Sequence, residues 1–153
     1  MQRKSESQLI LLGVALIATE ALGYGKFVRT GIEKRDLGRQ GEEIAEQFLC
    51  ARRYVVVERN YRCPYGEIDL VMQDRETLVF VEVRSHTGAT FGDPLESVTL
   101  RKQRQIAKAA SHYVLRHKIE NRPLRFDVIG VQWENGASRV THIPGAFDWP
   151  TWR

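Results

Sequence analysis

The fold of this chain is decided by Gly66-Glu67-Ile68-Asp69-Leu70 and, after a short turn, Val79-Phe80-Val81-Glu82-Val83-Arg84. In both segments apolar and other residues alternate, and β-branched and aromatic types are frequent, which predicts two β-strands. The polar residues 73–76 between them have the length of a hairpin turn. We therefore expect an antiparallel hairpin at the centre of the domain.

This hairpin is expected to bring acidic side chains together, because side chains on a strand alternate between two faces. With the turn centred on Asp74-Arg75, Asp69 would lie opposite Phe80, and Glu67 opposite Glu82. Asp69 and Glu82 are then diagonal neighbours on one face, with Cβ atoms about 7 Å apart or less. The other face of the first strand would carry Ile68, Leu70 and Met72.

The carboxylates of Glu67, Asp69 and Glu82 on one small patch would repel each other, so their negative charge has to be compensated. The candidates are a raised pKa, the nearby Arg84 and a bound divalent cation. We favour the cation, Mg²⁺ or Mn²⁺, because carboxylate oxygens are the ligands that such ions prefer.

The composition is that of one globular domain with an appended segment. The chain has 153 residues, 42% of them hydrophobic and 27% charged, with 23 Lys and Arg against 19 Asp and Glu. Between Glu96 and Glu120 there is no acid, and this stretch contains the basic residues Arg101, Lys102, Arg104, Lys108, Arg116 and Lys118. A basic element beside an acidic patch suits a polyanion handled with a metal ion, although a solvated helix face would look the same.

Residues 1–35 differ in character from residues 36–153, which we predict to be the functional domain. The apolar run at 9–18, extended to 22 through Glu20, is shorter than the roughly 20 apolar residues that a membrane span needs. A marginal membrane anchor with weak membrane association, a helix packed on the body and an appendage from an early start codon all remain open. We favour an N-terminal hydrophobic helix outside the domain, followed by a linker. Two cysteines without a metal-binding spacing indicate a reducing, cytoplasmic compartment.

The rest of the chain alternates between helical and strand patterns. A helix is expected from about Asp36, a strand at 54–57 and a turn at 60–64 before the central hairpin. After it we expect a loop at 85–94, a helix from the N-cap Thr99 to about Lys118, a strand at 124–131, a short last strand at 139–143 and an irregular tail. This order predicts an α/β fold with a mixed β-sheet flanked by helices.

Several of these segments together resemble a known family. The matching features are Gly41-Glu42 with Ala45, Arg59-Asn60, the two hairpin strands, Phe91-Gly92, Lys102, the run Arg125-Phe126-Asp127-Val128 and Ala146-Phe147. They look like the YraN-like family of uncharacterised, predicted endonucleases, from about Leu37 to Phe147. The resemblance implies a restriction-endonuclease-like core of the PD-(D/E)xK type, similar to Holliday-junction resolvases. Because those resolvases act as dimers, a homodimer is expected by analogy.

The resemblance also implies roles for individual residues. Asp69 would be the first metal ligand and Glu82 the second, and Arg84 occupies the position of the usual catalytic lysine. Glu42 matches an acid that some members of the superfamily bring from the first helix, and it would be a further ligand. Apart from the resemblance, the basic residues Arg101, Lys102, Arg104 and Lys108 of the predicted helix would contact phosphates without reading bases.

Arg84 is the departure from that pattern, because an arginine stays protonated and cannot act as a base. It can still stabilise charge on the phosphate or bind it bidentately. A metal-bound hydroxide or His86 would then have to take the role of the base. Arg125 and Asp127 share a strand face, and we expect them to pair structurally.

The sequence therefore favours a divalent-metal-dependent endonuclease that hydrolyses DNA phosphodiester bonds, with branched or single-stranded DNA as candidate substrates. One alternative is a catalytically weak nucleic-acid-binding module of the same fold. A second is a membrane-tethered interaction protein built on residues 9–22.

Overall fold

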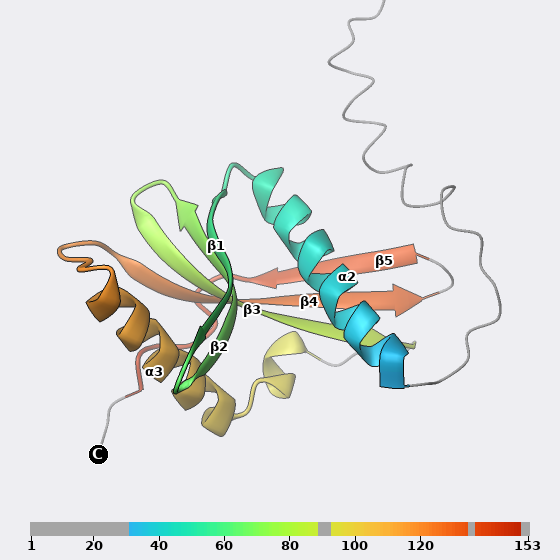
Figure 1. Ribbon diagram of the computed structural model, residues 1–153. Coiled ribbons are helices and arrows are strands. Elements are labelled where there is room, and N and C mark those ends of the chain that lie inside the picture. The colour runs from blue at the N-terminus through green and yellow to red at the C-terminus, as the bar shows by residue number, and fades with distance from the viewer. Residues whose placement is uncertain (1–30, 89–92, 135–136, 151–153) are drawn as a thin grey trace, which may run out of the picture.

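A computed structural model describes residues 31–88, 93–134 and 137–150, the first five through their backbone alone. The elements are α2 (Gly31–Cys50), β1 (Val55–Cys63), β2 (Gly66–Asp74), β3 (Thr77–Thr87), the 3-10 turn η1 (Pro94–Ser97), α3 (Leu100–Arg116), β4 (Leu124–Glu134) and β5 (Ala137–Ile143) (Figure 1). The strands form one sheet in the order β1-β2-β3-β4-β5, in which β3 and β4 are parallel and the other pairs antiparallel. The predicted α/β fold with a mixed sheet and helices is confirmed.

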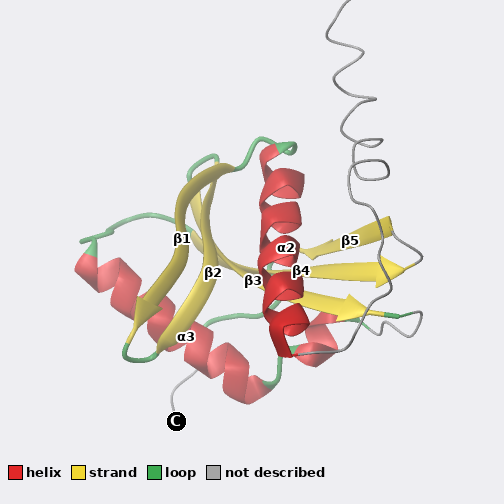
Figure 2. Ribbon diagram, turned by 45° about the vertical axis from the view of Figure 1, so that its right-hand side comes forward, coloured by secondary structure: helices red, strands yellow, loops and turns green. Residues whose placement is uncertain are grey.

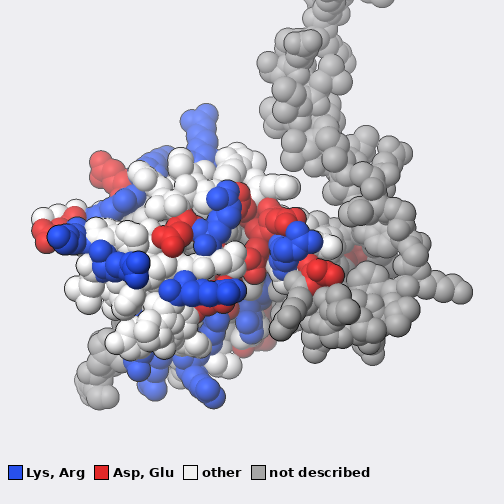
Figure 3. Space-filling view, in the orientation of Figure 1, with Lys and Arg blue, Asp and Glu red and all other residues white. Residues whose placement is uncertain are grey.

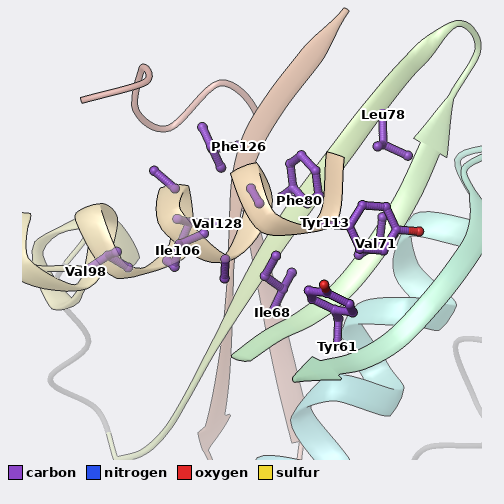
Figure 4. Close-up of a cluster of buried hydrophobic side chains, with 13 residues drawn as sticks. Tyr61, Ile68, Val71, Leu78, Phe80, Val98, Ile106, Tyr113, Phe126 and Val128 are labelled. Carbon is purple, nitrogen blue, oxygen red and sulfur yellow. The ribbon is translucent and has the colours of Figure 1, made fainter. Parts of the chain in front are cut away.

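The two helices cover opposite faces of this sheet (Figures 1 and 2). Helix α3 packs Ile106, Ala110 and Tyr113 onto one face, where they meet buried side chains of the central strands such as Phe80 and Phe126 (Figure 4). Helix α2 packs Ala45 and Leu49 onto the other face, against Leu70, Met72, Val79, Val81, Ile129 and Val131. Because both faces are covered, β3 is buried on both sides and can hold polar groups in a protected place.

Several predicted boundaries were wrong. Strand β1 continues to Cys63, so the expected turn at 60–64 shrinks to Pro64-Tyr65. Strand β3 continues to Thr87, into the expected loop, and α2 begins at Gly31 rather than near Asp36. The two strand extensions contain consecutive polar residues, which break the apolar alternation used for the prediction, although sheet pairing accepts them.

The register of the central hairpin differs from the prediction by two residues. Phe80 pairs with Val71 rather than with Asp69, and the ladder closes with Asp74 opposite Thr77, so the turn is Arg75-Glu76. A shift of two residues keeps every side chain on its face. It moves Glu82 away from the level of Glu67 and toward that of Asp69.

The pairing of β1 with β2 is irregular in two places: the register shifts between Val56 and Glu58, and the ladder skips Asn60 and Asp69. Arg59 pairs with Leu70 and Tyr61 with Ile68, and Asn60 between them has a positive φ of 50°. The expectation that Ile68 shares a face with Leu70 was wrong, because Ile68 belongs to the α3-side cluster while Leu70 belongs to the α2-side cluster. The alternation of faces is thus interrupted at Asp69, and its carboxylate accepts a backbone hydrogen bond from Val83 at 2.7 Å.

Gly41 lets α2 lie close to β3, which yields a first test. A Cβ at position 41 would overlap the Ser85 hydroxyl, whose oxygen is buried without a hydrogen-bond partner. We expect Gly41→Ala to lower the free energy of unfolding by about 1 kcal/mol, since the clash outweighs the gain in helix propensity. Urea denaturation measures this effect. Ser85→Ala should be nearly neutral alone and should recover most of the loss in the double variant, and equal losses in the single and double variants would contradict this packing.

Residues 144–150 form no helix or strand, as predicted, and Phe147 stacks on Phe126 with ring centroids 4.7 Å apart. Among the residues that the structure describes, no helix has the length and apolar character needed to cross a membrane. The predicted N-terminal hydrophobic helix and the residues Phe91-Gly92 lie outside the described residues.

Candidate active site

The centre of the candidate site is the pair Asp69 and Glu82 on the adjacent strands β2 and β3. Asp69 is half-buried, and one of its oxygens accepts the backbone N–H of Val83, the residue next to Glu82. Burial raises the pKa of Asp69, although the Val83 N–H and the charge of Lys102 oppose the rise. The structure thus brings together the two residues that were predicted to be the first and second metal ligands.

Glu82 is 3% exposed, and its two oxygens have different surroundings. Oε1 lies 3.1 Å from the Lys102 Nζ and 3.4 Å from an Arg84 nitrogen, whereas Oε2 has no hydrogen-bond partner. Burial, and then the negative charge of Asp69, raise the pKa of Glu82 to about 7 despite these two cations. A buried carboxylate with an unpartnered oxygen beside a second carboxylate is a site where a further positive charge would be stabilising.

Lys102 is the residue whose place the sequence did not predict. It was grouped with the phosphate contacts of α3, but its ammonium is directed at Glu82 and its side chain is 28% exposed. Thr99 caps the helix by accepting the Lys102 N–H at 3.3 Å, which fixes the first turn where Lys102 begins. The site therefore contains a lysine, supplied by α3 rather than by β3.

Arg84, which occupies the strand position of the usual lysine, is held by η1. Its guanidinium donates to the Ser97 hydroxyl at 3.2 Å and to the Ser97 carbonyl at 3.0 Å. Its contact with Glu82 is longer, at 3.4 Å. Arg84 thus ties η1, and with it the start of α3, to the strand that carries Glu82. The alternative base considered above, His86, is exposed near the end of β3.

Glu42 approaches the site from α2. It is half-buried, and its pKa is raised by burial and then by the charge of Asp69. The Asn60 amide, turned so that its nitrogen faces the acids, donates to Glu42 at 3.2 Å and to Glu67 at 3.0 Å. Glu67 also pairs with Arg62 at 3.2 Å. Asn60 is thus a residue at the site that had no predicted role, although it belongs to the Arg59-Asn60 match with the family.

The residues present fit a hard divalent cation. All the acceptors are carboxylate oxygens, and Mg²⁺ is commonly bound by one or two carboxylates, with water and substrate phosphate completing an octahedron. The described residues contain no group of three or more His, Cys, Asp and Glu side chains placed to hold a metal ion together. Asp69 and Glu82 are therefore the pair that would hold it, and the role of Glu42 as a further ligand stays a prediction.

The remaining basic residues of the prediction lie elsewhere on α3. Arg101, Arg104 and Lys108 line a pocket together with the β1–β2 turn. Basic and acidic side chains alternate over the face of the molecule that Figure 3 shows. Helix α3 thus places one lysine on the carboxylates and the other cations on a neighbouring surface.

The predicted pairing of Arg125 with Asp127 is present and is part of a buried polar network on the α2 side. Asp127 is fully buried and accepts two hydrogen bonds from Arg125, at 2.8 and 3.0 Å. It also accepts from the Gly145 N–H at 3.0 Å and lies 2.8 Å from His142 Nε2. Burial alone would raise the pKa of Asp127, but these hydrogen bonds outweigh it and lower the pKa. The network ties β4 to β5 and is structural.

Comparison with known proteins places the chain in a family. Residues 41–131, which contain all the site residues above, match the family model described as "Uncharacterised protein family UPF0102". A "UPF0102 protein" of Myxococcus xanthus is 46% identical over 116 residues, which cover 76% of this chain and 92% of that protein. Another, of Nitrosospira multiformis, is 50% identical over 111 residues, covering 72% and 92%. The chain belongs to the UPF0102 family, and the predicted YraN-like membership is confirmed.

Among solved structures, one of SfsA from Pyrococcus furiosus in complex with Ca²⁺ is similar to this chain. The alignment covers 82% of this chain and 73% of that one, at 16% sequence identity and a TM-score of 0.36. A likeness at this level assigns neither fold nor function.

Proposed function

We propose that this protein is a divalent-metal-dependent endonuclease with a restriction-endonuclease-like core that hydrolyses DNA phosphodiester bonds. The observation that carries the proposal is the unpartnered oxygen of the buried Glu82, beside Asp69 and with Lys102 at its other oxygen. Two carboxylates and an ammonium at one point are the groups that phosphodiester hydrolysis needs from a protein.

In this proposal Asp69 and Glu82 would hold Mg²⁺ or Mn²⁺, which when bound polarises the scissile phosphate and activates water. The Val83 N–H fixes the Asp69 carboxylate, and burial keeps water from competing for the Glu82 oxygens. Lys102 opposes the rise in the pKa of Glu82 and can donate to a phosphate oxygen once substrate is present. Arg84 acts as a positioning residue through η1.

Lys102 supplies a specific prediction. We expect Lys102→Gln to lower the rate constant for DNA cleavage by about 100-fold at saturating metal, because a positive charge at the developing phosphate charge is lost. Lys118→Gln is the matched control, since Lys118 is exposed beyond the end of α3. Single-turnover cleavage of a labelled substrate measures both. If Lys102→Gln and Lys118→Gln cleave DNA at the same rate, the assignment of Lys102 to the active site is wrong.

The experiment that tests the function is a substrate panel. Linear, nicked, flapped and four-way DNA are incubated with the full chain and Mg²⁺, Mn²⁺, Ca²⁺ or EDTA, with Asp69→Asn beside the wild type. Cleavage in Mg²⁺ or Mn²⁺ that Asp69→Asn abolishes supports the proposal. Salt-sensitive DNA binding without cleavage under any metal would support the alternative, a nucleic-acid-binding module.

A further inference from the structure

A second surface, formed by the β1–β2 turn and α3, has a composition of its own. It is a pocket of about 500 Å³ between the β1–β2 turn and α3. The turn contributes Pro64 and Tyr65, and the helix contributes Arg101, Arg104, Gln105 and Lys108. An aromatic ring and three cations are therefore combined without any acid among the lining residues.

Tyr65 is held in place although it is exposed. Its side chain is 53% exposed, and its ring meets the His112 ring edge-on at 5.9 Å between centroids. The next residue, Gly66, has a φ of 143°, and a Cβ there would lie 2.6 Å from the Gln105 amide nitrogen. Residues other than glycine rarely adopt a φ of this value, so the backbone of the turn favours glycine here. The tyrosine is thus an aromatic surface fixed against the helix and still open to a ligand.

The cations follow the helix beside this ring. Arg101, Arg104 and Lys108 stand at i, i+3 and i+7, so they extend over about 10 Å of the helix axis on one side. All three are exposed. A row of this length can contact successive phosphates of one nucleic-acid strand.

We propose that this pocket binds an unpaired nucleotide of a nucleic-acid strand, with its base stacked on Tyr65 and its neighbouring phosphates on Arg101, Arg104 and Lys108. A ring can stack on a base only where the base face is free, which a duplex does not offer. The inference rests on the proposed function for its ligand class and deepens it. Lys102 follows Arg101 of the pocket on the helix and contacts Glu82, so the pocket and the carboxylates are both contacted from the first turn of α3. The substrate is then DNA with a single-stranded segment beside the cleaved bond.

Binding without cleavage tests this inference separately from the nuclease activity. The full chain in EDTA is titrated into three fluorescein-labelled probes: a single-stranded oligonucleotide, the same strand annealed to its complement, and a strand of equal length with abasic sites. Fluorescence anisotropy gives Kd. We expect Tyr65→Ala to weaken binding of the single strand about tenfold and to leave the duplex and the abasic strand unchanged, while Tyr65→Trp retains wild-type affinity.

A second set of variants tests the basic side chains of the pocket. Arg104→Gln should weaken binding of all three probes and reduce the salt slope by about one, while Arg75→Gln, which removes an equally exposed charge at the β2–β3 turn, should not. Thermal unfolding checks that the variants are folded, as expected for exposed positions. Unchanged single-strand affinity in Tyr65→Ala, or an equal loss on the abasic strand, overturns the stacking site. Tyr65-dependent binding by a protein that cuts no DNA would leave this inference standing while the nuclease proposal fails.

Discussion

Glu82→Gln is expected to lower the rate of metal-dependent DNA cleavage by at least about 1000-fold, equivalent to roughly 4 kcal/mol of lost transition-state stabilisation. The substitution keeps the shape of the side chain and its contact with Lys102, but it removes the charge that would hold the cation. Stability is expected not to fall, because Glu82 is buried beside Asp69, whose charge opposes its ionisation. Activity and stability should therefore separate in this variant.

Glu43→Gln provides the matched control for that result. Glu43 is an exposed carboxylate on α2 that pairs with Arg39 at 2.9 Å. Its replacement removes the same charge next to Glu42 without touching Asp69 or Glu82, so cleavage should stay at the wild-type rate. Single-turnover kinetics with Mn²⁺ and urea denaturation should be run on both variants. A Glu82→Gln protein that cleaves as fast as Glu43→Gln would contradict the assignment of the site.

Asp127→Asn is expected to lower the free energy of unfolding by about 3 kcal/mol, because it breaks a buried, hydrogen-bonded charge pair. Arg125 and His142 both contact the same carboxylate oxygen of Asp127. In the variant, the new amide nitrogen would face these donors. Asp74→Asn is the control, since Asp74 also pairs with Arg125 at 3.0 Å but is 30% exposed. Asp74→Asn should lower the free energy of unfolding by less than about 1 kcal/mol. Equal losses of unfolding free energy in Asp127→Asn and Asp74→Asn would contradict the claim that burial makes the Asp127 pair the more stabilising one.

The same residue predicts a pH dependence. The pKa of Asp127 is lowered in the folded state, so its contribution to stability is fully present above the unfolded pKa of about 3.9 and is lost as pH falls through the folded value. The difference in stability between wild type and Asp127→Asn should therefore be smaller below about pH 4 than at pH 5. Urea denaturation across this range measures it, and a difference that grows toward low pH would overturn the assignment.

Sequence patterns predicted the pairing of Arg125 with Asp127 and the arrival of Asp69 and Glu82 in one region, because both depend on strand parity. The hairpin register was missed by two residues, since the turn Arg75-Glu76 contains none of the Gly or Asn residues that usually mark such turns. A shift of two residues keeps Glu82 on its predicted face, but it replaces the predicted diagonal relation of Asp69 and Glu82, and strand parity could not predict the interruption at Asp69.

The parts of the site that the sequence could not predict depend on contacts between distant segments. Lys102 lies one residue from Arg101, and only the packing of α3 on the sheet decides that it turns to Glu82. Its angular offset from the stripe of Arg101, Arg104 and Lys108 was the available signal. The distortion at Asn60 and Asp69 has no local signature either, since it needs two paired strands to deviate together.

The central claim is that Asp69 and Glu82 together hold a divalent cation, and Mn²⁺ diffraction tests it most directly. Crystals of the full chain soaked in Mn²⁺ should give an anomalous peak at the unpartnered Glu82 oxygen and a carboxylate oxygen of Asp69, about 2.0–2.2 Å from each. The peak should be absent from crystals of Glu82→Gln. An anomalous map with no peak between these two side chains in the wild type would contradict the account.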